Sequence, residues 1–148
     1  MSRVTPIFAD LVRVETRLYN GVSARLRAER GLSLGQFEFL EIIDRIPGCR
    51  VLDIVNEVAI TVGAVSKAVD RLVAAGWCVR MPHPQDRRSS VLQLTPEGAE
   101  VLAAARPVVE EELASVTAGI SSADLPRIAV AFATLRANLE ARSYGQSV

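Results

Sequence analysis

The sequence predicts a single, mostly helical domain with one short β-hairpin. About half of its 148 residues are hydrophobic and only 5% are aromatic, a composition that favours helices over sheets. Apolar residues recur at three- and four-residue steps at both ends of the chain, which is typical of amphipathic helices. Strict alternation occurs only in two short runs between residues 77 and 95. A chain of this length is expected to bury one core.

The first predicted helix covers residues 6–30 and ends at a glycine. Ser33 and Gln36 then stand in the S-x-x-Q relation of a capping box, so a second helix should begin there and end at the turn of residues 47–48. A short third helix is expected over residues 52–58.

A fourth helix follows, with Thr61 as its N-cap residue and Gly76 at its end. Helical neighbours lie three or four residues apart, so one face should pack on the core and the other should stay exposed. The apolar face is expected to hold Val62, Val65, Val69, Leu72 and Val73, and the opposite face Gly63, Ser66, Lys67, Asp70 and Ala74.

Two alternating runs, residues 77–81 and 91–95, are predicted to form the hairpin. Val and Leu suit its strands, and Pro82, Pro84 and Asp86 suit the loop between them.

Two long helices complete the chain. Thr95 should cap the first, with Pro96 in its first turn, and the second is expected from about residue 121 to residue 142. The order of elements is the winged helix-turn-helix plan, in which the second helix of the central pair enters the DNA major groove and the hairpin flanks it.

The charge distribution singles out the same region. Seventeen basic residues balance seventeen acidic ones, so the net charge gives no sign of a polyanionic partner. Of the segments 1–59, 60–96 and 97–148, only residues 60–96 are net positive. Their basic residues are Lys67, Arg71, Arg80, Arg87 and Arg88, and their acidic residues are Asp70 and Asp86.

Several stretches over residues 34–100 resemble the MarR family of bacterial transcription regulators. They are Leu34-Gly35-Gln36-Phe37 with Leu40, Thr61-Val62-Gly63-Ala64-Val65-Ser66-Lys67 with Asp70-Arg71-Leu72, Gly76-Trp77, Arg80, and Asp86-Arg87-Arg88 followed by Leu94-Thr95-Pro96-Glu97-Gly98. A D-x-R hairpin followed by L-T-x-x-G, behind a helix-turn-helix, is a specific combination. The chain departs from the pattern at Ala59, where many helix-turn-helix turns have glycine.

The resemblance implies a homodimer that binds double-stranded DNA. A two-fold dimer places its recognition helices about one DNA turn apart, so the operator should be a pseudo-palindrome. We expect a helical dimerisation region at residues 1–32 and 96–148 and a DNA-binding region at residues 33–95, within one continuous body. Apolar stripes in the outer helices support this expectation: Val101, Leu102, Val108, Val109, Leu113 and Val116, then Leu125, Ile128, Phe132, Leu135 and Leu139.

The resemblance also implies how such a regulator acts. Repression is the family's usual mode. A small phenolic or anionic effector is expected to bind between the dimer helices and the DNA-binding lobe and to shift the spacing of the two lobes.

The candidate DNA-binding residues lie in the fourth helix and the hairpin: Thr61, Val62, Gly63, Ala64, Ser66, Lys67, Arg71, Arg80, Arg87 and Arg88. Small residues at the helix start permit close approach, and the N–H groups there can bind a phosphate. Arginines at a hairpin tip can reach phosphates and a narrow minor groove.

Two acidic residues, Asp70 and Asp86, lie in this region although a carboxylate repels the phosphates of DNA. The resemblance implies that Arg88 enters the minor groove, and Asp86 is expected to orient it through a charge-assisted hydrogen bond. Asp70 should pair with a nearby arginine, while Arg71 should contact a phosphate or brace the hairpin.

Two other functions stay open at this point. A thiol-based redox switch would use Cys49 or Cys78; Cys78 is interpreted as a small buried residue, whereas Cys49, in a turn, is expected to be more exposed. A winged helix that binds only proteins would show no salt-dependent affinity for DNA.

Other classes lack support in the sequence. It contains no catalytic motif, no cofactor motif and no metal-ligand spacing, with His83 as the sole histidine, so we expect neither an enzyme nor a metal site. We expect no secretory leader, no membrane partner and a reducing, cytoplasmic setting, because no apolar run is long enough and no C-x-x-C occurs.

Overall fold

The computed structural model describes residues 3–142. Its elements in chain order are α1 (Val4–Arg30), α2 (Leu34–Arg45), α3 (Val51–Val58), α4 (Val62–Ala74), β1 (Cys78–His83), β2 (Asp86–Leu94), α5 (Pro96–Val116) and α6 (Asp124–Ala141). The predicted fold class is confirmed: the chain is mostly helical, β1 and β2 form an antiparallel hairpin, and the outer helices α1 and α5 contact each other. Residues 1–2 and 143–148, which belong to the predicted dimerisation region, lie outside the described residues.

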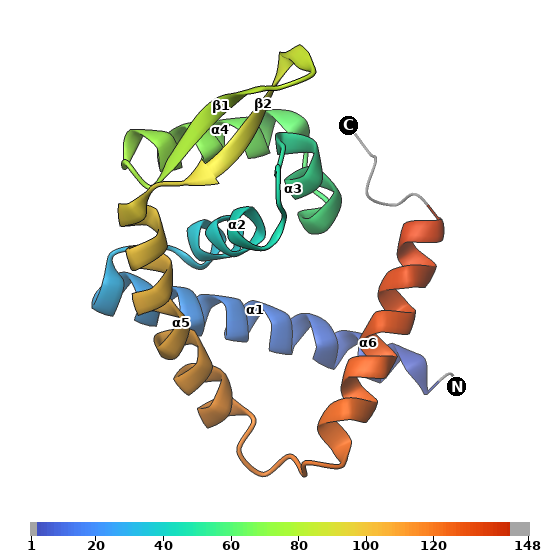
Figure 1. Ribbon diagram of the computed structural model, residues 1–148. Coiled ribbons are helices and arrows are strands. Elements are labelled where there is room, and N and C mark those ends of the chain that lie inside the picture. Colours follow the sequence, from blue (N-terminus) through green and yellow to red (C-terminus); the bar gives the residue numbers. More distant parts are fainter. Residues whose placement is uncertain (1–2, 143–148) are drawn as a thin grey trace.

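Three central helices, α2, α3 and α4, form a lobe together with the hairpin, and this lobe packs on the long helices α1 and α5. In Figure 1, α2, α3, α4 and the hairpin lie together on one side of α1 and α5, and α6 stands away from this lobe. No helix in residues 3–142 combines the length and the apolar character that a membrane crossing needs.

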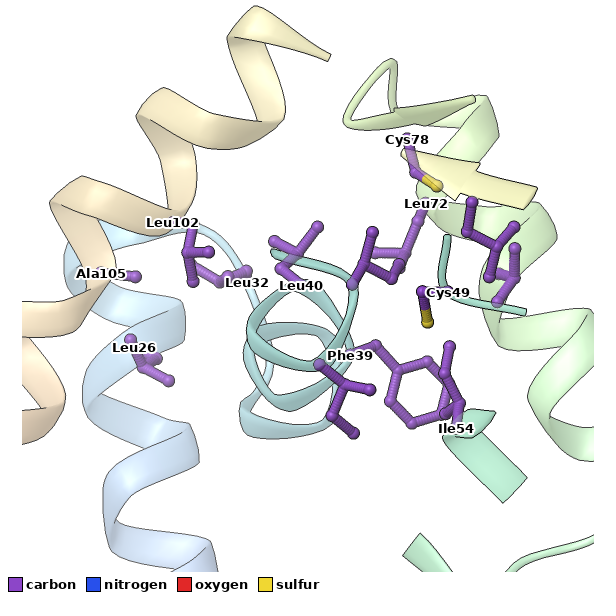
Figure 2. Packing of buried hydrophobic residues seen from close by; sticks show 14 of the residues in the cluster. Leu26, Leu32, Phe39, Leu40, Cys49, Ile54, Leu72, Cys78, Leu102 and Ala105 are labelled. Carbon is purple, nitrogen blue, oxygen red and sulfur yellow. The ribbon is translucent and has the colours of Figure 1, made fainter. Parts of the chain in front are cut away.

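The core lies where α2 meets the other elements of the lobe (Figure 2). Each of six elements contributes a fully buried side chain: Leu26 of α1, Leu40 of α2, Ile54 of α3, Leu72 of α4, Leu92 of β2 and Leu102 of α5. Because one core joins the lobe to α1 and α5, the hairpin and α4 have a fixed position on the rest of the described chain.

Local sequence signals explain where the central helices begin. The hydroxyl of Ser33 accepts a hydrogen bond from the N–H of Gln36 at 3.2 Å, and the Gln36 side chain accepts one from the N–H of Ser33 at 2.8 Å. The predicted capping box is thus confirmed. The Thr61 hydroxyl accepts a hydrogen bond from the N–H of Ala64 at 3.2 Å and caps α4 as predicted. Between α3 and α4, Ala59 adopts the left-handed conformation with φ 54°, which costs an alanine about 1 kcal/mol.

The predicted apolar face of α4 is only partly correct. Val65, Val69 and Leu72 are buried, but Val62 is 56% exposed and Val73 is 37% exposed. Val62 is the first residue of the helix and projects beyond the core, and Val73 lies one position beside the buried stripe. The exposed Val62 therefore belongs to the outer surface of α4.

The hairpin is longer than predicted, because both strands continue through the expected loop and leave a turn at residues 84–85. Pro82 lies inside β1. Each strand of a two-stranded sheet has one unpaired edge, so a proline without an N–H is tolerated there.

Strand pairing is irregular near the hairpin tip. Pro82 pairs with Ser90, but the next residue of β1, His83, pairs with Asp86. Residues 87–89 therefore have no partner in β1 and form a bulge in β2. Arg87 and Arg88 lie in this bulge.

The L-T-x-x-G motif joins the hairpin to α5. The Thr95 hydroxyl donates to the carbonyl of Gly76 at 2.6 Å and accepts from the N–H of Gly98 at 2.9 Å. A Cβ atom on Gly98 would lie 1.9 Å from the carbonyl oxygen of Trp77. The motif therefore fixes a close approach of α5 to the start of the hairpin, and only glycine fits there.

We expect Gly98→Ala to lower the free energy of unfolding by about 3 kcal/mol, the upper part of the range for overpacking, because the obstructing atoms belong to the backbone. Gly63→Ala is the matched control, since nothing lies within 4 Å of its Cβ position and alanine is the better helix former. Urea unfolding at one protein concentration measures both. Equal stability of Gly98→Ala and the wild type would contradict the predicted clash.

Candidate nucleic-acid interface

The predicted DNA-binding residues of α4 lie on its outer side. Thr61, Val62, Gly63, Ala64, Lys67 and Arg71 are exposed, and Ser66 is half-buried. The open space around Gly63 leaves the first turn of α4 accessible to a large ligand. The first turn of a helix also presents backbone N–H groups that have no partner in the helix. This surface can accept a phosphate or a base edge.

The hairpin presents two further cations. Arg87 and Arg88 are exposed, and no ion pair within residues 3–142 engages either of them or Lys67. Unpaired, exposed cations on α4 and on the hairpin form an electropositive surface, which attracts polyanions.

Asp86 contacts Arg88 differently from the sequence-based prediction. Its carboxylate accepts a hydrogen bond from the backbone N–H of Arg88 at 3.0 Å, whereas a bond to the guanidinium was expected. Aspartate often binds the backbone two residues ahead in this way and so fixes a turn. Asp86 thus holds the backbone of the bulge, and no acidic side chain of residues 3–142 pairs with the guanidinium of Arg88.

Arg80 connects the hairpin to α4. Its guanidinium forms an ion pair with Asp70 at 2.8 Å and donates to the carbonyl of Ser66 at 3.4 Å. The expectation that Asp70 pairs with a nearby arginine is confirmed. Arg80 is half-buried, and its guanidinium is directed to α4 by these two contacts.

Sequence reasoning missed one cation in this region. Arg50, at the start of α3, contacts Nε2 of His83 at the end of β1. The two residues are 33 positions apart, and no local pattern signals such a pair. In residues 3–142, no cluster of three or more His, Cys, Asp or Glu side chains is placed to hold a metal ion.

A cavity of about 820 Å³ lies between α1, α2 and α4. Its lining includes Tyr19 and Arg27 of α1, Gln36 and Phe39 of α2, and Arg71 of α4. Its size falls in the range of small-molecule sites. Within the described residues no ion pair engages Arg27 or Arg71. Arg71 thus lies on the exposed side of α4 and at this cavity.

Both cysteines are buried, and the predicted exposure of Cys49 is wrong. Cys49 is 0% exposed and Cys78 is 1% exposed, because the segment before α3 packs under the hairpin (Figure 2). Burial raises the pKa of the Cys49 thiol to about 11 and also raises the pKa of Cys78. The thiolate is the reactive form of cysteine, so neither residue has the environment of a redox sensor.

The apolar stripes of the outer helices divide into two groups. Leu102, Val108 and Val109 of α5 are buried in the chain's own core, so they are not available to a partner as predicted. No residue of α6 is buried. The exposed members of the predicted stripes are Leu113, Val116, Leu125, Ile128, Phe132, Leu135 and Leu139. Those of α6 recur at three- and four-residue steps and so share one face of that helix, and an exposed apolar face is typical of a protein interface.

Comparisons with known proteins agree with this geometry. Residues 32–90 match the sequence profile described as the MarR family. The "Multiple antibiotic resistance protein MarR" of Salmonella typhimurium strain LT2 is 36% identical over 67 residues, which are 45% of this chain and 46% of that protein. The chain therefore matches less than half the length of that curated relative.

Two solved structures resemble most of the described fold. The transcriptional repressor CouR, bound to a 23-mer DNA duplex, has 27% identity and a TM-score of 0.79, over 86% of this chain and 89% of CouR. Sco3205, a MarR family transcriptional regulator from Streptomyces coelicolor in complex with DNA, has 21% identity and a TM-score of 0.86, over 94% and 93% of the two chains.

The family match covers the helix-turn-helix and the hairpin tip, and the similarity of fold extends to the outer helices. The family consists of transcription regulators and not of enzymes, as the sequence analysis expected. Residues 32–90 thus match the MarR family of transcription regulators, and the described chain has the winged helix-turn-helix fold of solved MarR structures.

Proposed function

We propose that the protein is a homodimeric, sequence-specific DNA-binding transcription regulator. The observation that carries this proposal is the exposed surface formed by α4 and the hairpin, on which Lys67, Arg87 and Arg88 have no acidic partner among the described residues. Two structural relatives are described as bound to DNA. Their fold similarity to this chain supports the same use of its surface.

In the proposed complex, α4 enters the major groove and the hairpin follows the adjacent minor groove. Ser66 and Lys67 face the bases or phosphates, and the start of α4, from Thr61 to Ala64, receives a phosphate. Arg87 contacts the backbone, and Arg88 enters the minor groove, where the negative potential of A·T-rich DNA is strongest.

Arg80 and Arg71, which were predicted to contact DNA, have other main roles in this proposal. Arg80 mainly holds the hairpin on α4 through Asp70, and a phosphate contact would be additional. Arg71 faces the cavity, so it connects DNA binding with ligand binding.

The proposed dimer forms through the outer helices. The exposed apolar stripe of α6, together with Ile7 and Phe8 at the start of α1, needs a covering surface. A second copy of the chain provides it with two-fold symmetry. The dimer then presents two α4 helices to one face of the DNA.

We further propose that the protein is a repressor released by a small phenolic or anionic effector. The cavity between α1, α2 and α4 lies between the outer helices and the DNA-binding lobe, and Arg27 and Arg71 can pair with an anionic group there. A ligand that binds one lobe spacing better than another shifts the population toward that spacing. Release follows when the favoured spacing no longer fits two half-sites.

Selection from a pool of random DNA duplexes tests the DNA-binding proposal. We expect the bound sequences to share two inverted half-sites whose centres lie about one helical turn, roughly 10 base pairs, apart. The affinity for the selected site should fall steeply with salt. Recovery of sequences no different from the starting pool, with an affinity that salt does not change, would favour a protein-binding winged helix and refute the proposal.

A further inference from the structure

The outer part of the hairpin is only weakly held by its own hydrogen bonds. Pairing is regular from Cys78 to Pro82 and then shifts. Pro82 has no N–H to donate, and residues 87–89 have no partner in β1. A two-stranded hairpin is marginally stable in isolation. The direction of this tip therefore depends on contacts from elsewhere in the chain.

One such contact comes from the segment before α3. Nη2 of Arg50 lies against Nε2 of His83, the last residue of β1. A guanidinium can only donate, and a neutral imidazole has one acceptor nitrogen. The backbone N–H of Gln85 also lies 3.1 Å from Nδ1 of this ring, so the contact of Arg50 is a hydrogen bond in the tautomer whose acceptor is Nε2. His83 pairs with Asp86 across the hairpin. Arg50 therefore acts on the residue pair that closes the tip.

Arg50 is itself held firmly in the lobe. Its backbone N–H donates to Oδ2 of Asp53 at 2.8 Å, which fixes it at the start of α3. The preceding Cys49 is fully buried, and its carbonyl accepts a hydrogen bond from the N–H of Leu92 in β2 at 2.7 Å. A side chain with such a rigid base can set the position of the group it contacts.

We propose that Arg50 is a positioning residue for DNA binding, which holds the hairpin tip through His83 so that Arg88 meets the DNA in register with α4. This inference rests on the proposed function. Arg80 holds the base of the hairpin on α4, and Asp86 fixes the backbone inside the tip. Arg50 supplies the remaining connection, between the tip and α3, and does not contact DNA itself.

The affinity of Arg50→Ala for the selected site, measured by fluorescence anisotropy at several salt concentrations, tests this role. We expect a loss of about tenfold, the order of one hydrogen bond made by a charged side chain, with an unchanged salt slope. The loss should vanish in an Arg88→Ala background, because the tip then carries no minor-groove contact to position. His83→Ala should cause the same loss as Arg50→Ala, and the double variant should lose no more than either.

Arg45→Ala is the matched control. It also removes one arginine, and it breaks a contact elsewhere, the ion pair between Arg45 and Glu57 at 3.0 Å. Among the described residues, Arg45 makes no hydrogen bond or ion pair with the hairpin. It should leave the affinity unchanged. An Arg50→Ala affinity equal to that of the control would overturn the inference. A loss that persists with Arg88→Ala, together with a salt slope reduced by about one, would also overturn it, because Arg50 would then bind phosphate directly.

A second measurement separates this inference from the proposed function. Amide hydrogen exchange of residues 85–90 in the protein without DNA should be faster in Arg50→Ala than in Arg45→Ala or the wild type. Unchanged exchange would refute the positioning role even if DNA binding is established. If the wild type selects no DNA sequence, the proposed function fails and the role of Arg50 in DNA binding fails with it, whereas faster exchange would still establish the contact with His83.

Discussion

Phe132→Asp should convert the dimer into monomers and abolish high-affinity operator binding. Phe132 is 52% exposed at the middle of the α6 stripe. In the proposed dimer this stripe is covered by the partner, and a carboxylate buried there without a counter-charge costs several kcal/mol. Two-fold symmetry places two such carboxylates in one interface. A monomer can occupy only one half-site, so the gain in affinity from binding both half-sites is lost.

Val130→Asp is the matched control, because Val130 lies on the same helix, two residues away and therefore on the opposite side. It is 68% exposed, and its variant should stay dimeric. Sedimentation equilibrium at micromolar concentration distinguishes the two variants, and circular dichroism checks that both remain helical. A Phe132→Asp protein that still sediments as the dimer would contradict the proposed interface, as would a wild type that is a helical monomer.

Features that depend on neighbouring residues were predictable from the sequence. The capping box of Ser33 and Gln36 and the cap at Thr61 follow from side chains that bind backbone groups three residues ahead. Helical periodicity likewise placed all six helices near their observed positions within the described residues. These hydrogen bonds join residues only three positions apart, so the sequence order alone determines which groups interact.

Features that depend on packing between distant segments were not predictable. Periodicity identified the apolar stripe of α5 but could not tell that Val108 faces the chain's own core while Val116 stays exposed. A turn beside a glycine suggested an exposed Cys49, but the hairpin covers it. The contact of Arg50 with His83 arises in the same way, from two segments that only the fold brings together.

The family motifs combine structural and functional positions, which the sequence alone did not separate. Thr95 and Gly98 join α5 to the hairpin, and their conformation explains that part of the motif without DNA. Asp86 and Arg88 have no comparable role in joining elements of the fold. The exposed carboxylate of Asp86 accepts a hydrogen bond from the backbone N–H of Arg88, an exposed arginine without an ion pair among the described residues. These two residues are therefore where the proposed function can be tested with least interference from folding.

The salt dependence of DNA affinity in Arg88→Ala and Asp86→Ala tests whether the hairpin tip binds DNA. We expect Arg88→Ala to weaken binding roughly ten- to hundredfold, the range for a hydrogen bond from a charged group, and to reduce the salt slope by about one. The loss should affect specific and nonspecific DNA alike, because the contact does not depend on the operator's base sequence. Arg30→Ala, an exposed arginine at the end of α1, serves as the control.

Asp86→Ala separates orientation from simple charge. Removing an acid near DNA should strengthen binding if electrostatics alone acts. Glu100→Ala, which removes an exposed acid of α5 outside the proposed DNA-binding surface, gives the reference for losing one negative charge elsewhere on the protein. If Asp86 holds the bulge that carries Arg88, its loss should instead weaken operator binding by about threefold or more, a part of the value of the contact it supports. We therefore expect weaker binding for both Arg88→Ala and Asp86→Ala. A gain in affinity for Asp86→Ala, or no loss for Arg88→Ala at physiological salt, would contradict it.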